Sequence, residues 1–379
     1  WMLHGAIPSM MPFLTEKLLP DRYRSDLASL VSITRPEAVI TYREFEPEVH
    51  AALGEGSSVR RVLVSDTVEP VHAVNEEEFA AFDGLRRAPG DIVLLQHSSG
   101  TTGLQKGVAL SHQAVFNQLE NYSRTLHLDA DDVIVSWLPL YHDMGLIAGF
   151  LMPILLRTPL VLLSPFEWVR SPVKLIQAVT KYHGTLTWLP NFAYNFCAKK
   201  IRERDLEGVD LSTLRAISNC SEPMRFESHQ LFYERFAPYG LKPSALCTCY
   251  AMAENVFAVT QGGIDAPVVV DEIDREAMQV ERVARPSETG RASVKMLSAG
   301  PAIPGTEVRV ADEHGHTVPD RVIGELALRS DCMLSGYYHR EDATHKALKG
   351  GWYFTGDYGY KVGEQVYVAG RKKDMIIVG

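Results

Sequence analysis

Short apolar runs alternate with helix-like patterns through the middle of the chain, and this alternation constrains the fold more than any other feature. The strand-like runs are residues 91–96, 133–138, 160–163, 185–189, 214–218 and 245–250. Helix-like patterns separate them, over residues 111–122, 145–156 and 172–184 and from about residues 191 and 226 onward. Strands that alternate with helices imply a parallel sheet with helices on both faces. The sequence therefore predicts an α/β fold of layered, mostly parallel sheets.

The pattern changes after Gly262. A polar, charge-rich segment, residues 265–295, has no clear period. Short alternating strands with turns between them follow at residues 308–315, 324–330, 366–371 and 375–379, which predicts a small antiparallel β subdomain. We therefore expect three parts: a first α/β subdomain over residues 1–195, a second over 196–295 that ends in the polar segment, and a β-barrel-like part over 296–379.

Composition excludes some classes of protein. The formal net charge of -9 argues against a nucleic-acid binder, which would carry a clustered basic face. The longest apolar run, residues 145–156, is too short to span a membrane. Five cysteines without regular spacing favour buried free thiols in a reducing compartment, so we expect a cytoplasmic protein.

The strongest local signal is the string HSSGTTGLQKG, residues 97–107, directly after an apolar strand. Its glycines let backbone N–H groups converge, its hydroxyls add donors, and Lys106 adds one positive charge, which together suit a polyphosphate. It is not the common P-loop, because Gln105 precedes the lysine and Gly107 follows it. A Gly-rich loop taken alone is more often a flexible turn, so the whole string carries the interpretation.

The string SSGTTGLQKG, residues 98–107, resembles the signature loop of the adenylate-forming superfamily. Three further strings resemble the family's motifs in the expected order: YAMAE (250–254), WYFTGDYG (352–359) and GRKKDMI (370–376). The chain departs from the family at Gln105, where proline is usual, and at Ala251, where glycine is usual. The nearest members are fatty acyl-AMP ligases and long-chain acyl-CoA synthetases, and the resemblance implies the N-terminal domain, cut at both ends.

The resemblance implies ATP and Mg²⁺ as cofactors and assigns roles to individual residues. Lys106 and Glu254 would be catalytic, and Glu254 would hold Mg²⁺ with the hydroxyl of Ser98, through the oxygen ligands that this ion prefers. Asp357 would hold the ribose hydroxyls. The nucleotide contacts would be Ser98, Ser99, Gly100, Thr101, Thr102, Gly103, Lys106, Asn219, Ser221, Tyr250, Ala251, Met252, Asp357, Arg371 and Lys373.

Three of these residues also have an ordinary structural interpretation. Outside its motif, Glu254 would be a solvated carboxylate, Asp357 would cap its own turn, and Arg371 would be a surface charge. The motif context favours the functional interpretation in all three cases.

Two segments, residues 136–150 and 188–195, resemble parts of fatty acyl-AMP ligases, chiefly in the strings YHDMGL and PNFAY. The resemblance implies a fatty acid substrate and makes His142 a gate at the mouth of the acyl pocket, not a base. The pocket would be formed by Tyr141, His142, Met144, Gly145, Pro190, Asn191 and Phe192. The alternative is that the apolar members are plain core.

The acceptor of the acyl group is argued from spacing. Residues 250 and 300 are 50 positions apart, a link that is shorter in ordinary acyl-CoA synthetases. Residues 265–295 fit the insertion of fatty acyl-AMP ligases, which is thought to disfavour CoA and leave the acyl group for an acyl carrier protein.

Two other functions stay open: an acyl-CoA synthetase, and a non-catalytic adenylate-binding domain. The resemblance also implies a C-terminal lid domain with a catalytic lysine beyond Gly379, so we expect these 379 residues to bind nucleotide but to adenylate slowly or not at all.

Overall fold

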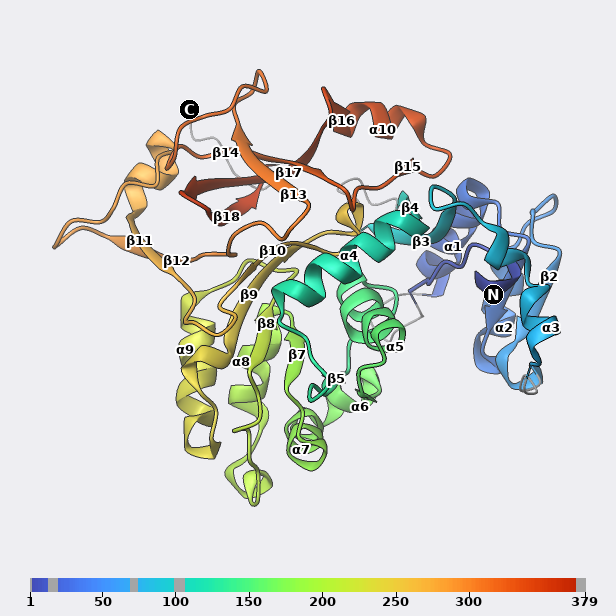
Figure 1. The fold of residues 1–379 in the computed structure, drawn as a ribbon, viewed down its shortest axis with the longest axis horizontal. Helices are drawn as coiled ribbons and strands as arrows, with labels where there is room; N and C mark the ends of the chain where they lie inside the picture. Colours follow the sequence, from blue (N-terminus) through green and yellow to red (C-terminus); the bar gives the residue numbers. More distant parts are fainter. Residues whose placement is uncertain (1, 13–19, 69–73, 99–105, 373–379) are drawn as a thin grey trace. The chain divides into compact units, whose positions relative to one another are not determined.

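The fold is described from a computed structural model, which defines residues 2–12, 20–68, 74–98 and 106–372, without the side chain of Ser98. The chain forms two compact units, and Figure 1 labels helices and strands of both. The first comprises residues 1–113 and 334–344, and the second comprises residues 114–333 and 345–379. Each unit is described on its own.

The first unit contains two small sheets. Strands β1 (Ala38–Thr41) and β2 (Arg61–Val64) pair in parallel, whereas β3 (Ile92–Ser98), β4 (Lys106–Ser111) and β15 (Gly336–Tyr337) form an antiparallel sheet with β4 in the middle. A local core of Leu27, Val31, Val49 and Ala52 joins the first two α-helices. The helices are η1 (Met2–His4), α1 (Pro20–Thr34), η2 (Arg43–Phe45), α2 (Glu46–Ala52), η3 (Ser65–Thr67), α3 (Glu76–Ala80) and η4 (Asp83–Arg86).

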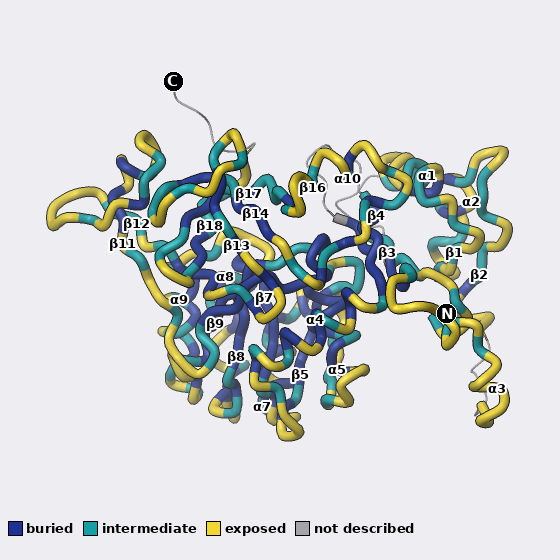
Figure 2. Tube along the Cα trace, turned by 45° about the horizontal axis from the view of Figure 1, so that its top comes forward, coloured by how far each residue is buried: buried dark blue, intermediate teal, exposed yellow. Residues whose placement is uncertain are grey.

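A six-stranded sheet forms the centre of the second unit, in the order β10-β9-β8-β7-β5-β6. Its strands are β5 (Ile134–Ser136), β6 (Leu160–Leu162), β7 (Leu186–Leu189), β8 (Ala216–Asn219), β9 (Leu246–Ala251) and β10 (Ala258–Gly262). All neighbours pair in parallel except β10, which runs antiparallel to β9. Every residue of β7 and β8 is buried, as expected of parallel strands covered on both faces (Figure 2).

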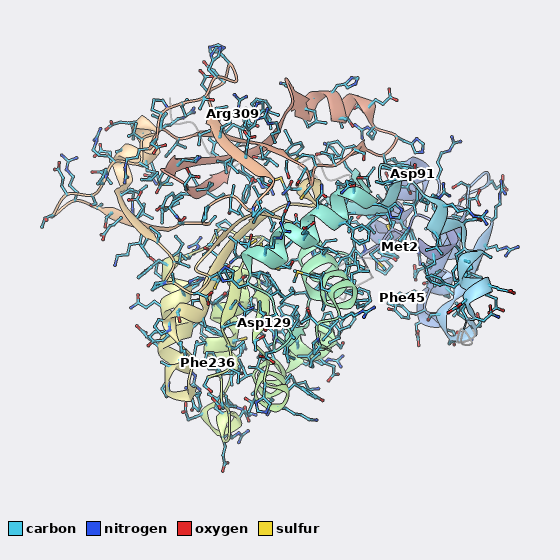
Figure 3. The ribbon with its side chains drawn as sticks, in the orientation of Figure 1. Met2, Phe45, Asp91, Asp129, Phe236 and Arg309 are labelled. Atoms are coloured by element: carbon cyan, nitrogen blue, oxygen red, sulfur yellow. The ribbon has the colours of Figure 1, made fainter. Side chains whose placement is uncertain are left out.

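Helices pack around this sheet through apolar faces. Phe232 and Phe236 on α9 are fully buried with ring centroids 4.6 Å apart, and Phe236 is labelled in Figure 3. The helices of this part are α4 (His112–Thr125), η5 (Met144–Leu151), α5 (Met152–Leu156), α6 (Pro165–Arg170), α7 (Val173–Tyr182), α8 (Asn191–Lys200), η6 (Glu203–Leu206), α9 (Phe226–Phe236), η7 (Ala237–Tyr239), η8 (Pro243–Ala245) and η9 (Ala253–Asn255).

An antiparallel sheet follows, as the sequence predicts. Its strands are β13 (Thr306–Ala311), β14 (Gly324–Ser330), β16 (Leu348–Lys349), β17 (Trp352–Val362) and β18 (Gln365–Arg371), with α10 (Glu341–Ala347) before β16. The predicted α/β class with parallel and antiparallel parts is therefore confirmed. The predicted strand at residues 375–379 lies outside the described residues.

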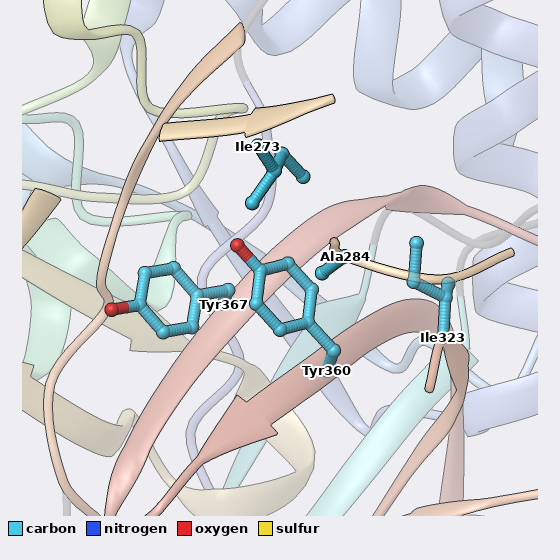
Figure 4. Packing of buried hydrophobic residues seen from close by; sticks show 5 residues of the cluster. All are labelled: Ile273, Ala284, Ile323, Tyr360 and Tyr367. Carbon is cyan, nitrogen blue, oxygen red and sulfur yellow. The ribbon is translucent and has the colours of Figure 1, made fainter. Parts of the chain in front are cut away.

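The polar segment 265–295 is folded, although its sequence shows no period. It contains β11 (Val270–Asp274) and η10 (Ala277–Glu281), and β11 pairs antiparallel with β12 (Ser293–Leu297). Figure 4 shows the core that this segment shares with the last strands, formed by Ile273, Ala284, Ile323, Tyr360 and Tyr367. The two tyrosine rings stack with centroids 4.6 Å apart.

A polar contact holds the same segment in place. Asp271 on β11 forms an ion pair with Arg321 at 3.1 Å and accepts a hydrogen bond of 3.0 Å from the hydroxyl of Tyr360 on β17. The segment is therefore anchored to the antiparallel sheet by both apolar and polar contacts.

Local predictions need three corrections. The strand at residues 91–96 pairs antiparallel with β4. The sequence did not reveal β4 as a strand, because its residues continue directly into helix α4. Ser171 does not cap α7 with its side chain, since Pro172 occupies the N-cap position. The predicted helix 145–156 starts as the π-helix η5 and becomes α-helical only at Met152.

A close approach explains the glycine at the start of η5. A Cβ added to Gly145 would lie 2.3 Å from the carbonyl oxygen of Pro139, a distance that no side chain tolerates. Among the described residues, no helix is long and apolar enough to cross a membrane.

Candidate active site

The phosphate-loop residues are described only in part. Ser99, Gly100, Thr101, Thr102 and Gly103 lie outside the described residues, and so does the side chain of Ser98. Lys106 is the first residue of β4, in the first unit. Its ammonium lies 4.7 Å from the centroid of the Tyr337 ring.

Three residues from separate motifs meet in the second unit. The hydroxyl of Tyr250 donates a hydrogen bond of 2.6 Å to Oδ2 of Asp357, and Nε of Arg371 lies 2.9 Å from Oδ1 of the same carboxylate. Asp357 and Arg371 are direct partners in the register of β17 and β18. We call these three residues the Asp357 cluster.

The carboxylate at the centre of this cluster is 6% exposed. Burial raises the pKa of Asp357, while the positive charge of Arg371 and the hydrogen bond from Tyr250 oppose the shift. A buried carboxylate with both oxygens engaged is held in one orientation, which suits recognition of a neighbouring pair of hydroxyl groups.

Glu325, which the sequence did not single out, helps to fix the turn before Asp357. The backbone N–H of Asp357 donates to the hydroxyl of Thr355 at 3.0 Å. One oxygen of Glu325 accepts a hydrogen bond from the N–H of Gly356 at 3.1 Å, and its other oxygen binds Nζ of Lys372 at 2.8 Å. Gly356 has a φ of +74°, where L side chains are strained.

Glu254 lies in η9, directly after β9, and is 8% exposed. Val256, two residues further, has a φ of +63°, an outlier for a β-branched residue that marks a strained turn. Asp143 is a second carboxylate in this region, because the negative charge of Glu254 contributes to its raised pKa. Burial is the main cause and raises the pKa of Asp143 to about 6, although its Oδ1 accepts a hydrogen bond from the N–H of Met144.

The donor set fits a magnesium ion that is shared with phosphate. Mg²⁺ binds one or two carboxylates and takes its remaining ligands from water and phosphate. Within the described ranges, no group of three His, Cys, Asp or Glu side chains is arranged to hold a metal ion. Glu254 could supply one such carboxylate, and Asp143, whose pKa the charge of Glu254 helps to raise, could supply a second.

Asn219 ends β8 and is fully buried. Its side-chain N–H donates to Oδ1 of Asn191 at 3.0 Å, and the same oxygen of Asn191 accepts from the N–H of Arg225 at 3.1 Å. Oδ1 of Asn219 has no hydrogen-bond partner within the described part of the chain. Since ligands bind at the carboxyl ends of parallel strands, this buried acceptor stands where a ligand donor is expected.

The neighbouring segment is built on a second strained position. Ser221 is exposed with a φ of +67°, and a carboxylate oxygen of Glu222 accepts a hydrogen bond of 2.8 Å from the N–H of Phe192, which caps α8. The predicted nucleotide residue Asn219 therefore contacts the predicted pocket residue Asn191, and Glu222, the neighbour of Ser221 in the sequence, contacts Phe192.

The remaining pocket residues fall into two groups. Met144, Gly145 and Pro190 are buried, whereas Phe192 is 47% exposed and His142 is exposed. The rings of Tyr141 and His142 lie 4.6 Å apart, and crowding of the His142 ring by protein atoms lowers its pKa.

Two tryptophans that the sequence did not single out border Phe192. Trp137 and Trp168 stack with centroids 3.5 Å apart, and their centroids lie 6.5 and 6.2 Å from that of Phe192.

Two predicted nucleotide residues lie beside Tyr250. Ala251 ends β9 and is half-buried, and the N–H of Met252 donates to the carbonyl oxygen of Phe257 at 2.9 Å. Lys373 lies outside the described residues.

Comparison with known proteins gives a consistent result. The family described as AMP-binding enzyme matches residues 18–338. A protein of Mycobacterium tuberculosis named as a ligase is 32% identical over 100% of this chain and 68% of its own length. A medium-chain-fatty-acid–[acyl-carrier-protein] ligase, JamA, of Moorena producens is 29% identical over 76% of this chain and 50% of its own length.

A similar solved structure is that of a fatty acyl-adenylate ligase from Legionella pneumophila in complex with acyl adenylate and pyrophosphate. It matches with a TM-score of 0.87 and 28% identity, over 99% of this chain and 65% of that chain. The chain thus spans between about half and two thirds of the length of these proteins.

Proposed function

The chain belongs to the AMP-binding enzyme family, and from this premise we propose that it activates a fatty acid with ATP. In this reaction a carboxylate oxygen attacks the α-phosphate, the bond to the β-phosphate breaks, and acyl-AMP and pyrophosphate form. The observation that carries the proposal is the Asp357 cluster, because it joins three motifs around one oriented, buried carboxylate.

Each residue has a task in this reaction. Both reactants are anionic, so neutralising and aligning charge dominates the barrier. Lys106 would bind the β- and γ-phosphates, and Asp357 would accept hydrogen bonds from the ribose hydroxyls. Tyr250 would stack on adenine, and the orphaned oxygen of Asn219 would accept a hydrogen bond from the adenine amino group.

Magnesium is part of the proposal. When bound, Mg²⁺ would supply positive charge to the phosphates. Glu254 and Asp143 would hold it, since one or two carboxylates beside a polyphosphate form the donor set that this ion prefers. Protons at Asp143 would compete with the metal below about pH 6.

We propose a fatty acid as the substrate because JamA and the Legionella enzyme act on fatty acyl groups, as their names say. The acyl chain would enter past Tyr141 and His142 and lie against Met144, Gly145, Pro190, Asn191 and Phe192. His142 would act as a gate at the mouth of this pocket, where its ring lies 4.6 Å from that of Tyr141.

For the acceptor we propose the thiol of an acyl carrier protein. The support is the anchoring of residues 265–295 on β17 and β18. Strand β18 ends at Arg371, inside the string GRKKDMI, which resembles the family's motif at the hinge to a C-terminal domain. A rigid segment beside the hinge would restrain the C-terminal lid domain that the family resemblance implies. An acyl-CoA synthetase is the second candidate, and a binding-only domain the third. A cytoplasmic location is proposed with this function.

The test is a product assay by mass spectrometry. The 379-residue chain, and the protein at the full length of its relatives, are incubated with ATP, Mg²⁺ and fatty acids of increasing chain length, with and without CoA. Acyl-AMP that persists in the presence of CoA supports the proposal, and conversion to acyl-CoA supports the synthetase. No adenylate from the longer protein with any acid would refute fatty acid activation.

A further inference from the structure

Tyr337 lies beside Lys106, a contact that none of the four family motifs explains. The ammonium of Lys106 lies 4.7 Å from the centroid of the Tyr337 ring, within the range of a cation–π contact. Tyr337 is 6% exposed, whereas Lys106 is half-buried. The two residues are 231 positions apart in the sequence but lie in the same unit.

The strand register produces this contact. Strand β15 consists of only two residues, Gly336 and Tyr337, and it pairs antiparallel with β4 so that Tyr337 lies opposite Val108. Side chains that are directly opposite share a face of the sheet, and Lys106, two residues before Val108, lies on that face too. The ring is therefore a diagonal neighbour of Lys106.

Backbone contacts hold the short strand firmly. The N–H of Tyr338 donates to the carbonyl oxygen of Gly107 at 2.7 Å, and the N–H of Ser335 donates to that of Ala109 at 2.9 Å. The hydroxyl of Thr344 accepts a hydrogen bond of 2.9 Å from the N–H of Tyr337. A two-residue strand with three such contacts can present one side chain at a fixed place.

An aromatic ring orients a lysine differently from a carboxylate. A carboxylate partner would fix the ammonium but would also neutralise it, so an incoming anion would have to compete with a salt bridge. The ring attracts the ammonium through its quadrupole and leaves the full positive charge. Among the described residues, Lys106 forms no ion pair, which fits this arrangement.

We propose that Tyr337 is a positioning residue for Lys106: its ring orients the ammonium for the β- and γ-phosphates of a nucleoside triphosphate without cancelling its charge. This inference rests on the proposed function, because that function places a polyphosphate at Lys106. It adds that the string GYY, residues 336–338, which lies outside the four motifs, belongs to the phosphate-binding machinery.

The test compares two nucleotides that differ only in the groups that Lys106 would bind. Affinities for Mg²⁺-ATP and for AMP are measured by calorimetry on the 379-residue chain, for the native chain and for Tyr337→Leu, Tyr337→Phe and Lys106→Ala. Tyr337→Leu should weaken ATP binding about tenfold and leave AMP binding unchanged, since AMP lacks the β- and γ-phosphates. Tyr337→Phe keeps the ring and should retain ATP affinity.

A double variant separates positioning from damage to the fold. Once Lys106 is alanine, the further change Tyr337→Leu should have no additional effect on ATP affinity, because its target is gone. Tyr367→Leu, a matched change at another buried tyrosine, should leave the ratio of AMP to ATP affinity unchanged.

Two results would overturn the inference: an equal loss of ATP and AMP affinity in Tyr337→Leu, or an effect of this change that persists in the Lys106→Ala background. If the native chain binds neither nucleotide, the proposed function itself fails and the inference falls with it.

Discussion

Removing one buried side chain should detach the segment 265–295 from the antiparallel sheet. Ile273 on β11 is fully buried against Ala284, Ile323, Tyr360 and Tyr367. The change Ile273→Ala deletes three carbon atoms from this cluster, and such changes in packed cores cost about 3 kcal/mol. An isolated two-stranded ribbon such as β11–β12 is marginally stable, so the loss should appear as local opening.

Hydrogen exchange measures that opening directly. A loss of about 3 kcal/mol corresponds to a roughly hundredfold fall in amide protection if the segment opens on its own. We expect this fall at the amides of β11 and β12, while the amides of β7 and β8 keep their protection. In the protein at the full length of its relatives, the same change should raise acyl-CoA formation, because the restraint on the hinge is weakened.

Ile176→Ala provides the matched control. Ile176 on α7 is 2% exposed and lies outside the segment, so its loss should lower the free energy of unfolding without selective exchange at β11 and β12. If Ile273→Ala lowers protection evenly across the chain, as the control does, the segment is an integral part of the core and the reasoning about a separate restraint is wrong.

Three further predictions concern other parts of the second unit. Asp357→Asn should weaken AMP and ATP binding alike by about tenfold or more in calorimetry, since both nucleotides carry the ribose; an unchanged AMP affinity would contradict the assignment. Arg215→Met should lower the free energy of unfolding in urea by about 3 kcal/mol, because Asp132, 2% exposed, loses its ion-pair partner; a change below about 1 kcal/mol would contradict this. Burial lowers the pKa of His229, which stacks on Tyr194, to about 4. The contribution of the neutral imidazole to the free energy of unfolding is therefore fully present above pH 6.5 and is lost as the pH falls toward 4. In urea titrations, the free energy of unfolding should fall by up to about 3 kcal/mol less between pH 7 and pH 4 in His229→Gln than in the native chain. The same fall in both proteins would refute this prediction.

The parallel part of the fold was predictable because its strands carry a strong signal. Residues 186–189 and 216–219 are buried at every position, so they form short apolar runs that few other structures explain. Strand β11 alternates weakly and carries charged residues, and it is stabilised by distant partners such as Tyr360 and Arg321. No local pattern in the sequence reveals those partners.

The sequence proposes the residues of the candidate site one by one but does not show how they lie together. Separate motifs point to Tyr250, Asp357 and Arg371. Their contact depends on the register of β17 and β18 and on the packing of Tyr250, from β9, against Asp357. The sequence did not single out Asp143 and Tyr337, because the neighbours that draw attention to them, Glu254 and Lys106, lie more than 100 positions away. All residue roles at the candidate site, including those of Ser98, Glu254, His142 and Asp357, remain predictions for the experiments above.

The most direct test of the central claim is the binding of a stable acyl-adenylate mimic to the 379-residue chain. We would titrate the chain, and its Asp357→Asn variant, with a dodecanoyl sulfamoyl adenosine and with AMP.

The account predicts that the mimic binds at least about a hundredfold more tightly than AMP, because one site recognises the acyl chain and the nucleoside together, and that Asp357→Asn weakens both ligands. Equal affinity for the mimic and for AMP, or tight binding of the mimic that is indifferent to Asp357, would contradict the account.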